Sequence, residues 1–140
     1  MTTTDPLELY RRMVLIRHFE ETTIEVYRSG EMPGLAHSYA GQEASAVGIC
    51  AALRPDDTIT STHRGHGHIL AKGASPARMM LEIMGKEGGY CAGRGGSMHI
   101  TDVSLGVLGA NGVVAGGVGI ALGSALSAER LGADRVSVCF

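Results

Sequence analysis

The feature that most limits what this chain can fold into is a glycine-rich segment between residues 88 and 112. The chain has 21 glycines in 140 residues, and eight of them fall in this segment, where neither a helical nor a strand period holds. A connection of that length inside a compact domain usually serves a function. We therefore expect one long loop that lies close to a ligand, because glycine lets the backbone approach it.

Helix signals precede and follow this loop. Asp5-Pro6 joins a capping side chain to a proline at the first helical position, and predicts a helix to about Tyr27 that Gly30 ends. Ser75-Pro76 repeats the signal and predicts a helix through Ile83. We expect further helices over residues 42–53, 63–72 and 115–131.

Two short segments have the composition of strands. Thr58-Ile59-Thr60 predicts a short strand, and Val136 to Phe140 predicts a buried one. Together with the helices they indicate a helix-rich α/β fold, with a parallel sheet flanked by helices. We expect residues 1–140 to form a single, incomplete domain, because the chain ends within a strand that we expect to be central.

Charge, hydropathy and cysteine content exclude several classes of protein. A formal net charge of -2 lacks the basic balance that nucleic-acid binding requires. No stretch reaches the roughly 18 apolar residues needed to span a bilayer, and Met1 to Pro6 has neither region of an export signal. Cys50, Cys91 and Cys139 are odd in number and widely spaced, which argues against a disulfide framework or a zinc site. We expect a cytoplasmic protein with no membrane contact.

The run from Thr62 to His68 carries the strongest chemical signal. It places one guanidinium, Arg64, among His63, His66 and His68 beside glycines, which suits the binding of a phosphate. Two other interpretations stay open. The three histidines could form a metal site, although no matching carboxylate or cysteine spacing is present, or the run could be an exposed polar helix start.

Two further glycine-containing segments suit an anion or a heteroaromatic ring. Gly93 to His99 adds a second cation, Arg94, although a tight surface turn explains this segment as well. Gly109 to Val114 precedes a predicted helix whose N–H groups could face a ligand. Gly117-Val118-Gly119 does not complete a dinucleotide fingerprint, because Leu122 replaces the third glycine and we expect no strand before it.

His37 and Glu43 flank the segment 38–42. By residue type alone, Glu43 is expected to favour the start of a helix through its negative charge, and His37 to be a histidine whose hydrogen bonds are satisfied.

In this order the segments resemble the α subunits of thiamine-diphosphate-dependent dehydrogenase E1 components, of the pyruvate and acetoin dehydrogenase type. The resemblance covers essentially the whole chain. It rests on these motifs: Tyr10-Arg11-Arg12-Met13, His37 with Gly41-Gln42-Glu43-Ala44, Arg64-Gly65-His66-Gly67, Lys72-Gly73, Gly95-Gly96-Ser97-Met98-His99 and Gly109-Ala110-Asn111-Gly112-Val113-Val114.

The resemblance implies a role for five residues. His63 and Arg64 match positions that bind the cofactor's diphosphate, and His37 matches a histidine that reaches toward the thiazolium and the substrate. Gly112 and Val114 match positions whose backbone C=O and N–H hold the aminopyrimidine. Many pyruvate-type members have Tyr where this chain has His63, and the run around it is more similar to acetoin-type members.

The resemblance also implies a function and partners. Such a subunit pairs with an E1 β subunit, in an α2β2 assembly, and passes an acyl group from a 2-oxo acid or acetoin to a lipoyl-bearing E2 acyltransferase. The family binds Mg²⁺ through a later Gly-Asp-Gly turn and an Asn, so its ligands are expected beyond residue 140 and none within this chain. The chain alone is then expected to be inactive. A non-catalytic subunit-contact module, or a free-standing phosphate binder using His63, Arg64 and Arg94, are the alternatives.

Overall fold

The computed structural model describes residues 5–140, and within them helices dominate over strands. Because Asp5 Oδ1 accepts a hydrogen bond from the Leu7 N–H at 3.0 Å, the first helix begins where its cap predicts. The elements in chain order are α1 (Pro6–Ser29), α2 (Glu43–Ala52), β1 (Thr58–Thr62), α3 (His66–Ala71), α4 (Pro76–Ile83), the 3-10 helices η1 (Gly96–Met98) and η2 (Val103–Leu105), β2 (Val107–Asn111), α5 (Val118–Leu131) and β3 (Ser137–Cys139).

The predicted helix ends are confirmed where a capping residue marks them. Gly30 ends α1 in the left-handed conformation, with φ of 79°, and Ser75 Oγ accepts a hydrogen bond from Arg78 N–H at 3.4 Å at the start of α4. None of the helices described between residues 5 and 140 has the length and apolar character to cross a bilayer.

The three strands form one parallel sheet in the order β2-β1-β3. Thr62 at the end of β1 pairs with Asn111 at the end of β2, and Thr60 pairs with Cys139 of β3. The predicted α/β class, with a parallel sheet flanked by helices, is therefore confirmed.

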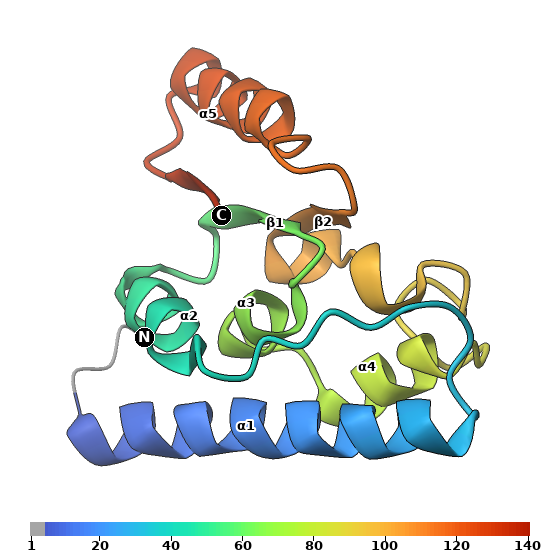
Figure 1. Cartoon of the computed structure of the whole chain (residues 1–140). Coiled ribbons are helices and arrows are strands. Elements are labelled where there is room, and N and C mark those ends of the chain that lie inside the picture. Colours follow the sequence, from blue (N-terminus) through green and yellow to red (C-terminus); the bar gives the residue numbers. More distant parts are fainter. Residues whose placement is uncertain (1–4) are drawn as a thin grey trace.

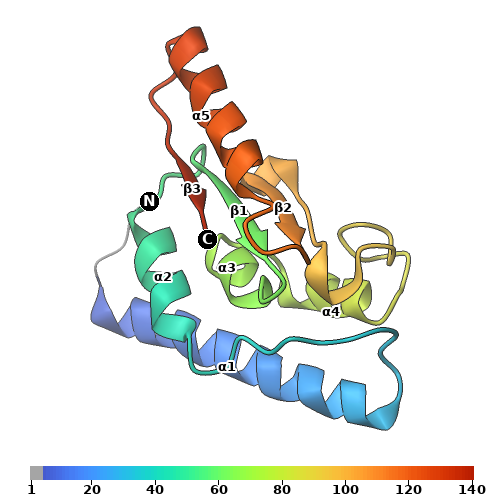
Figure 2. The same ribbon diagram turned by 45° about the horizontal axis from the view of Figure 1, so that its top comes forward.

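The helices lie in layers on both sides of this sheet. The long helix α1 runs along the base of the molecule, with α2, α3 and α4 between it and the strands, and α5 covers the opposite side (Figure 1). In the turned view α5 lies beside β3, with one end against the strands and the other projecting away from them (Figure 2). Buried apolar side chains of most elements form the core: Ile16, Phe19, Tyr39, Val47, Ile59, Ile69, Met79, Ile83, Ile100 and Val107.

The segment 88–112 is not one loop, so that prediction was wrong. It contains η1, η2 and the strand β2. The sequence of β2, Val-Leu-Gly-Ala-Asn, has no apolar alternation, and it becomes a strand because β1 offers its backbone a parallel partner. A strand therefore does precede residues 117–119, and only the missing third glycine at Leu122 argues against a dinucleotide fingerprint there.

The last two elements are less buried than their sequences predict. Ser137 and Val138 are half-buried and Cys139 is exposed, because among the described residues β3 pairs only with β1. Helix α5 buries only Ala121 and Ala128, since its main contacts are with β1 and β3. The predicted buried strand is thus an incompletely covered one.

Candidate functional site

Two of the predicted site segments follow neighbouring strands at the same edge of the sheet. His63 comes directly after β1 and Gly112 directly after β2, and the pairing of Thr62 with Asn111 brings these strand ends together. Open α/β sheets bind their ligands at the carboxyl ends of parallel strands. The fold therefore places both segments where a ligand site is expected.

A third segment, around His37, lies against the first. One Nη of Arg64 donates a hydrogen bond to the carbonyl of Ser38, and the rings of His37 and His63 meet edge-on with centroids 5.2 Å apart. The strand β1 and the segment before α2, which are distant in sequence, thus bring two imidazoles and one guanidinium together.

Both of these imidazoles have an unused nitrogen. Nδ1 of His37 and Nδ1 of His63 are buried and have no hydrogen-bond partner among the described residues. Buried polar atoms are nearly always paired, so two neighbouring exceptions mark this place as a candidate ligand site. The expectation of a satisfied His37 is wrong, because its ring faces His63 instead of an acceptor or donor.

The segment after β2 offers unused backbone groups. Gly112, Val113 and Val114 are exposed, and Asn111 Oδ1 shapes the turn by accepting the Val113 N–H at 2.8 Å. Within residues 5–140 neither the Gly112 carbonyl nor the Val114 N–H makes a hydrogen bond. A bound ring with complementary groups could use both.

The helix α3 is buried, which overturns the interpretation of residues 63–68 as an exposed polar helix start. His68 Nδ1 lies 2.7 Å from Ser61 Oγ, and its ring stacks on Phe140 at 3.7 Å. Burial lowers the pKa of His68 to about 4, so this imidazole is neutral at neutral pH. His66 is likewise turned inward, and of the three histidines only His63 remains for a ligand.

The alternative of a histidine metal site is also wrong. His63 faces His37, whereas His66 and His68 contact Glu20 and Ser61. In the part of the chain that the structure describes, no group of three His, Cys, Asp or Glu side chains could hold a metal ion. The cysteines of that part are all free thiols.

Sequence analysis missed Glu82, which holds the glycine-rich segment in place. Its buried carboxylate accepts four backbone N–H groups at 2.7 to 3.1 Å, those of Cys91, Gly93, Gly95 and Gly96. Burial alone would raise the pKa of Glu82, but these four donors outweigh it and hold the pKa below its ordinary value. No spacing rule predicts such a contact, because a glutamate within an amphipathic helix is usually solvated.

Glu43 joins the start of α2 to α1. Its Oε1 accepts a hydrogen bond from Arg17 Nε at 2.7 Å and another from the Gly41 N–H at 3.0 Å. The bond from Arg17 is the main reason that the pKa of Glu43 falls to about 2. The guanidinium of Arg94, the second predicted cation, is exposed and makes no hydrogen bond or ion pair with any residue between 5 and 140.

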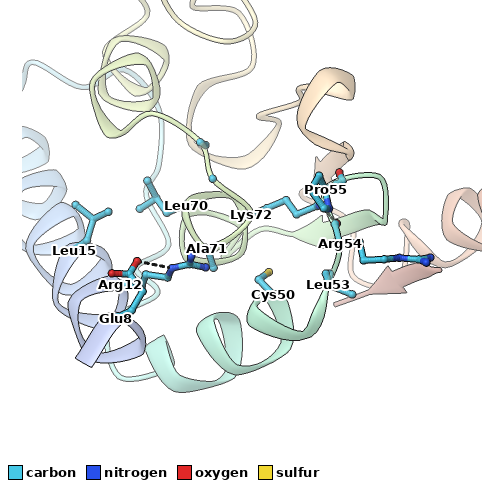
Figure 3. Close-up of a pocket in the computed structure, with 12 residues that line it drawn as sticks. Glu8, Arg12, Leu15, Cys50, Leu53, Arg54, Pro55, Leu70, Ala71 and Lys72 are labelled. Carbon is cyan, nitrogen blue, oxygen red and sulfur yellow. Dashed lines mark hydrogen bonds and ion pairs between the residues drawn. The ribbon is translucent and has the colours of Figure 1, made fainter. Parts of the chain in front are cut away.

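A pocket of about 440 Å³ lies elsewhere, between α1, α2 and the end of α3 (Figure 3). It borders Arg54 and Pro55, which precede β1, so it is at the opposite end of the strand from His63. Its cations already have partners: Arg12 pairs with Glu8 at 3.1 Å, and Lys72 Nζ donates to the Arg54 carbonyl at 2.9 Å. We therefore assign the candidate site to the carboxyl ends of β1 and β2.

The family described as "Dehydrogenase E1 component" matches residues 11–140. The acetoin:2,6-dichlorophenolindophenol oxidoreductase subunits alpha of Bacillus subtilis and Cupriavidus necator are 53% and 50% identical, over 100% and 96% of this chain. The pyruvate dehydrogenase E1 component subunit alpha of Rhizobium meliloti is 40% identical over 97% of it. The chain covers 42%, 40% and 39% of these three relatives, about two fifths of their length.

Proposed function

The chain belongs to the dehydrogenase E1 component family, and from this premise we propose that it carries part of a thiamine-diphosphate site in the α subunit of a 2-oxo-acid or acetoin dehydrogenase. The observation that supports this most is the pair of buried, unpartnered Nδ1 atoms of His37 and His63 beside Arg64. They lie at the strand edge where the fold favours a ligand.

The residues at this edge fit the diphosphate end of the cofactor. Arg64 is a fixed charge with five N–H donors, and its bond to Ser38 leaves further donors for an anion. His63 adds a nitrogen that has no other partner among the described residues. We propose that these two side chains bind the diphosphate, by a charge-assisted hydrogen bond and a neutral one.

The residues after β2 fit the ring end. We propose that the free carbonyl of Gly112 and the free N–H of Val114 hold the aminopyrimidine, and that His37 faces the substrate. When bound, thiamine diphosphate would supply the carbanion chemistry of the reaction. The protein contributes orientation, through backbone groups whose positions the parallel pairing of β1 and β2 fixes.

The described residues do not fit Mg²⁺. This hard cation requires oxygen ligands in near-octahedral geometry, and residues 5–140 contain no suitable cluster. We propose that the metal's ligands lie beyond residue 140. The roles proposed for the five site residues do not depend on these ligands.

Among substrates we favour acetoin. The relatives at 53% and 50% identity are named for acetoin, and the one at 40% for pyruvate dehydrogenase. We further propose that the protein acts in the cytoplasm in an α2β2 assembly with an E1 β subunit, and transfers the acyl group to a lipoyl-bearing E2 acyltransferase. A non-catalytic subunit-contact module is the second candidate, because the described part lacks a metal site.

Calorimetric titration of thiamine diphosphate with Mg²⁺ tests this proposal. It compares this chain with a full-length form, meaning the chain continued to the length of its relatives, with and without the β subunit. We expect metal-dependent binding to the full-length form only. Tight binding to the 140-residue chain would refute our account of the metal, and no binding even to the full-length form with its β subunit would favour the non-catalytic module.

Arg64→Ala in the full-length form tests the site itself. We expect it to weaken cofactor binding by about 1.5–3 kcal/mol, the usual size of a lost charge-assisted hydrogen bond. Arg94→Ala is the matched control, because that guanidinium is exposed and has no partner among the described residues. Equal affinities for both variants would remove Arg64 from the site.

A further inference from the structure

Three buried polar side chains, Glu20, His66 and Ser97, form a hydrogen-bonded network close to the candidate site. His66 Nδ1 lies 2.8 Å from Glu20 Oε1, and His66 Nε2 lies 2.9 Å from Ser97 Oγ. Glu20 and His66 are 0% exposed and Ser97 is 4% exposed. The imidazole of His66 thus joins the Glu20 carboxyl to the Ser97 hydroxyl, with one ring nitrogen to each.

This geometry resembles a nucleophilic triad, but burial excludes that role. The Ser97 hydroxyl is used by His66 and is covered, so no substrate can reach it. Glu20 Oε2 is also buried, with no hydrogen-bond partner among the described residues, and the rings of Phe19 and His66 meet edge to face. Burying such groups costs free energy, and apolar side chains of similar volume are often at least as stable. Stabilisation of the fold alone therefore explains this hydrogen-bonded network poorly.

The elements that the network joins suggest a different role. Glu20 belongs to α1, His66 begins α3 two residues after Arg64, and Ser97 is the central residue of η1. The residues beside Ser97, Met98 and His99, face Gly112: a Cβ on that glycine would lie 3.7 Å from the His99 ring and 3.8 Å from the Met98 sulfur. The network thus connects α3, which follows β1, with η1. The residues of η1 and just after it lie next to Gly112, which follows β2.

We propose that Glu20, His66 and Ser97 are positioning residues that fix the spacing between the diphosphate-binding and ring-binding segments of the candidate site. Hydrogen bonds are directional and hold η1 at one distance from α3, whereas apolar contacts would let it slide. Glu82 binds the preceding residues, up to Gly96, and the hydrogen bond of Ser97 then joins the next residue of the segment to α3. This inference rests on the proposed function only for the identity of the ligand.

The test uses the full-length form with its β subunit and compares Ser97→Ala with Ser104→Ala, which removes an exposed hydroxyl from the same glycine-rich segment. Two quantities are measured: amide hydrogen exchange over residues 97–114 without ligand, and the Kd for thiamine diphosphate with Mg²⁺. We expect Ser97→Ala to raise the Kd about 3- to 10-fold, the effect of losing one hydrogen bond. We also expect faster exchange both at residues 97–100 and at residues 110–114, and no change for Ser104→Ala.

Each outcome decides the proposal. Faster exchange confined to residues 97–100, or an unchanged rate throughout, overturns the proposal. The hydrogen-bonded network would then have no effect on the segment after β2. If the unaltered protein does not bind thiamine diphosphate, the proposed function fails, but the exchange measurement still decides the positioning role. If Ser97→Ala does not fold, Glu20→Gln keeps the shape and removes the charge, and the same two measurements apply to it.

Discussion

Residues 89–99 of the glycine-rich segment are more firmly held than their sequence suggests, and the helix α5 is less buried than its sequence suggests. The segment has little regular structure, yet the Glu82 carboxylate binds four of its backbone N–H groups and His66 binds its Ser97. Helix α5 is fully regular, yet Val118, Leu122 and Leu126 on it are at least half exposed. Regular secondary structure and tertiary anchoring are therefore separate properties.

The difference has a physical cause. In α5 the backbone groups bond within the helix, so the element needs little from the rest of the chain. The glycine-rich segment has few such internal partners, for example the Arg94 N–H on the Cys91 carbonyl, and most of its other N–H groups must find acceptors elsewhere or remain unsatisfied. We therefore expect substitutions in this segment to be costly and substitutions on α5 to be nearly neutral.

Glu82→Ala should give the largest effect, a loss of about 3 kcal/mol in the free energy of unfolding. It leaves four N–H groups without their acceptor, and removing one partner from a buried charged network costs several kcal/mol. Urea denaturation of the chain measures it. Glu87→Ala is the control, because that residue is exposed and lies five positions later in the sequence. Similar losses of unfolding free energy in both variants would show that Glu82 does not anchor the segment.

Gly89→Ala should destabilise the chain by about 2 kcal/mol. Its added Cβ would lie 2.5 Å from Glu82 Cα and 2.7 Å from Glu82 N, and backbone atoms cannot move aside cheaply. Gly123→Ala is the matched change on α5, where nothing lies within 4 Å, and it should instead stabilise by about 0.5–1 kcal/mol. Thermal unfolding of both variants tests the sign, and two shifts in the same direction would contradict the prediction.

The stability of the glycine-rich segment should depend on pH through Glu82. The folded-state pKa of this carboxyl is lowered, so its contribution is fully present above the unfolded value of about 4.3 and is lost as the pH falls through the folded-state pKa. We expect wild-type protein and Glu82→Gln to differ in unfolding free energy at pH 7 and to converge in acid. A difference that stays constant with pH would show that the charge of Glu82 contributes nothing.

Leu122→Ser on α5 should have the smallest effect, within about 0.5 kcal/mol, because the side chain is 69% exposed and loses almost no burial. Denaturation of the 140-residue chain measures it, with Ala128→Ser as the contrasting variant, since Ala128 is 2% exposed. A large loss for Leu122→Ser would mean that α5 is covered in solution, for example by a second copy of the chain.

Local signals in the sequence predicted much of the fold. The Asp5 and Ser75 caps and the stop at Gly30 were predicted and are observed, because each depends on atoms within one turn of the helix. The strand β2 was missed, because its partner β1 is distant in the sequence and its own residues do not alternate. Five residues were predicted for the site, and the structure places all five in segments that meet at the carboxyl ends of β1 and β2, although their roles remain predictions.

The sequence by itself determined the α/β class, the order of the motifs and the family, since these depend on residue identity and short-range spacing. Only the tertiary structure decided which histidines have an unpartnered nitrogen: among the described residues Nδ1 of His37 and of His63 has none, whereas His66 and His68 are used by Glu20, Ser97 and Ser61. The four histidines have the same chemistry, and two are only two residues apart. What separates them is the direction of each side chain within the packed core, which depends on elements far away in the sequence.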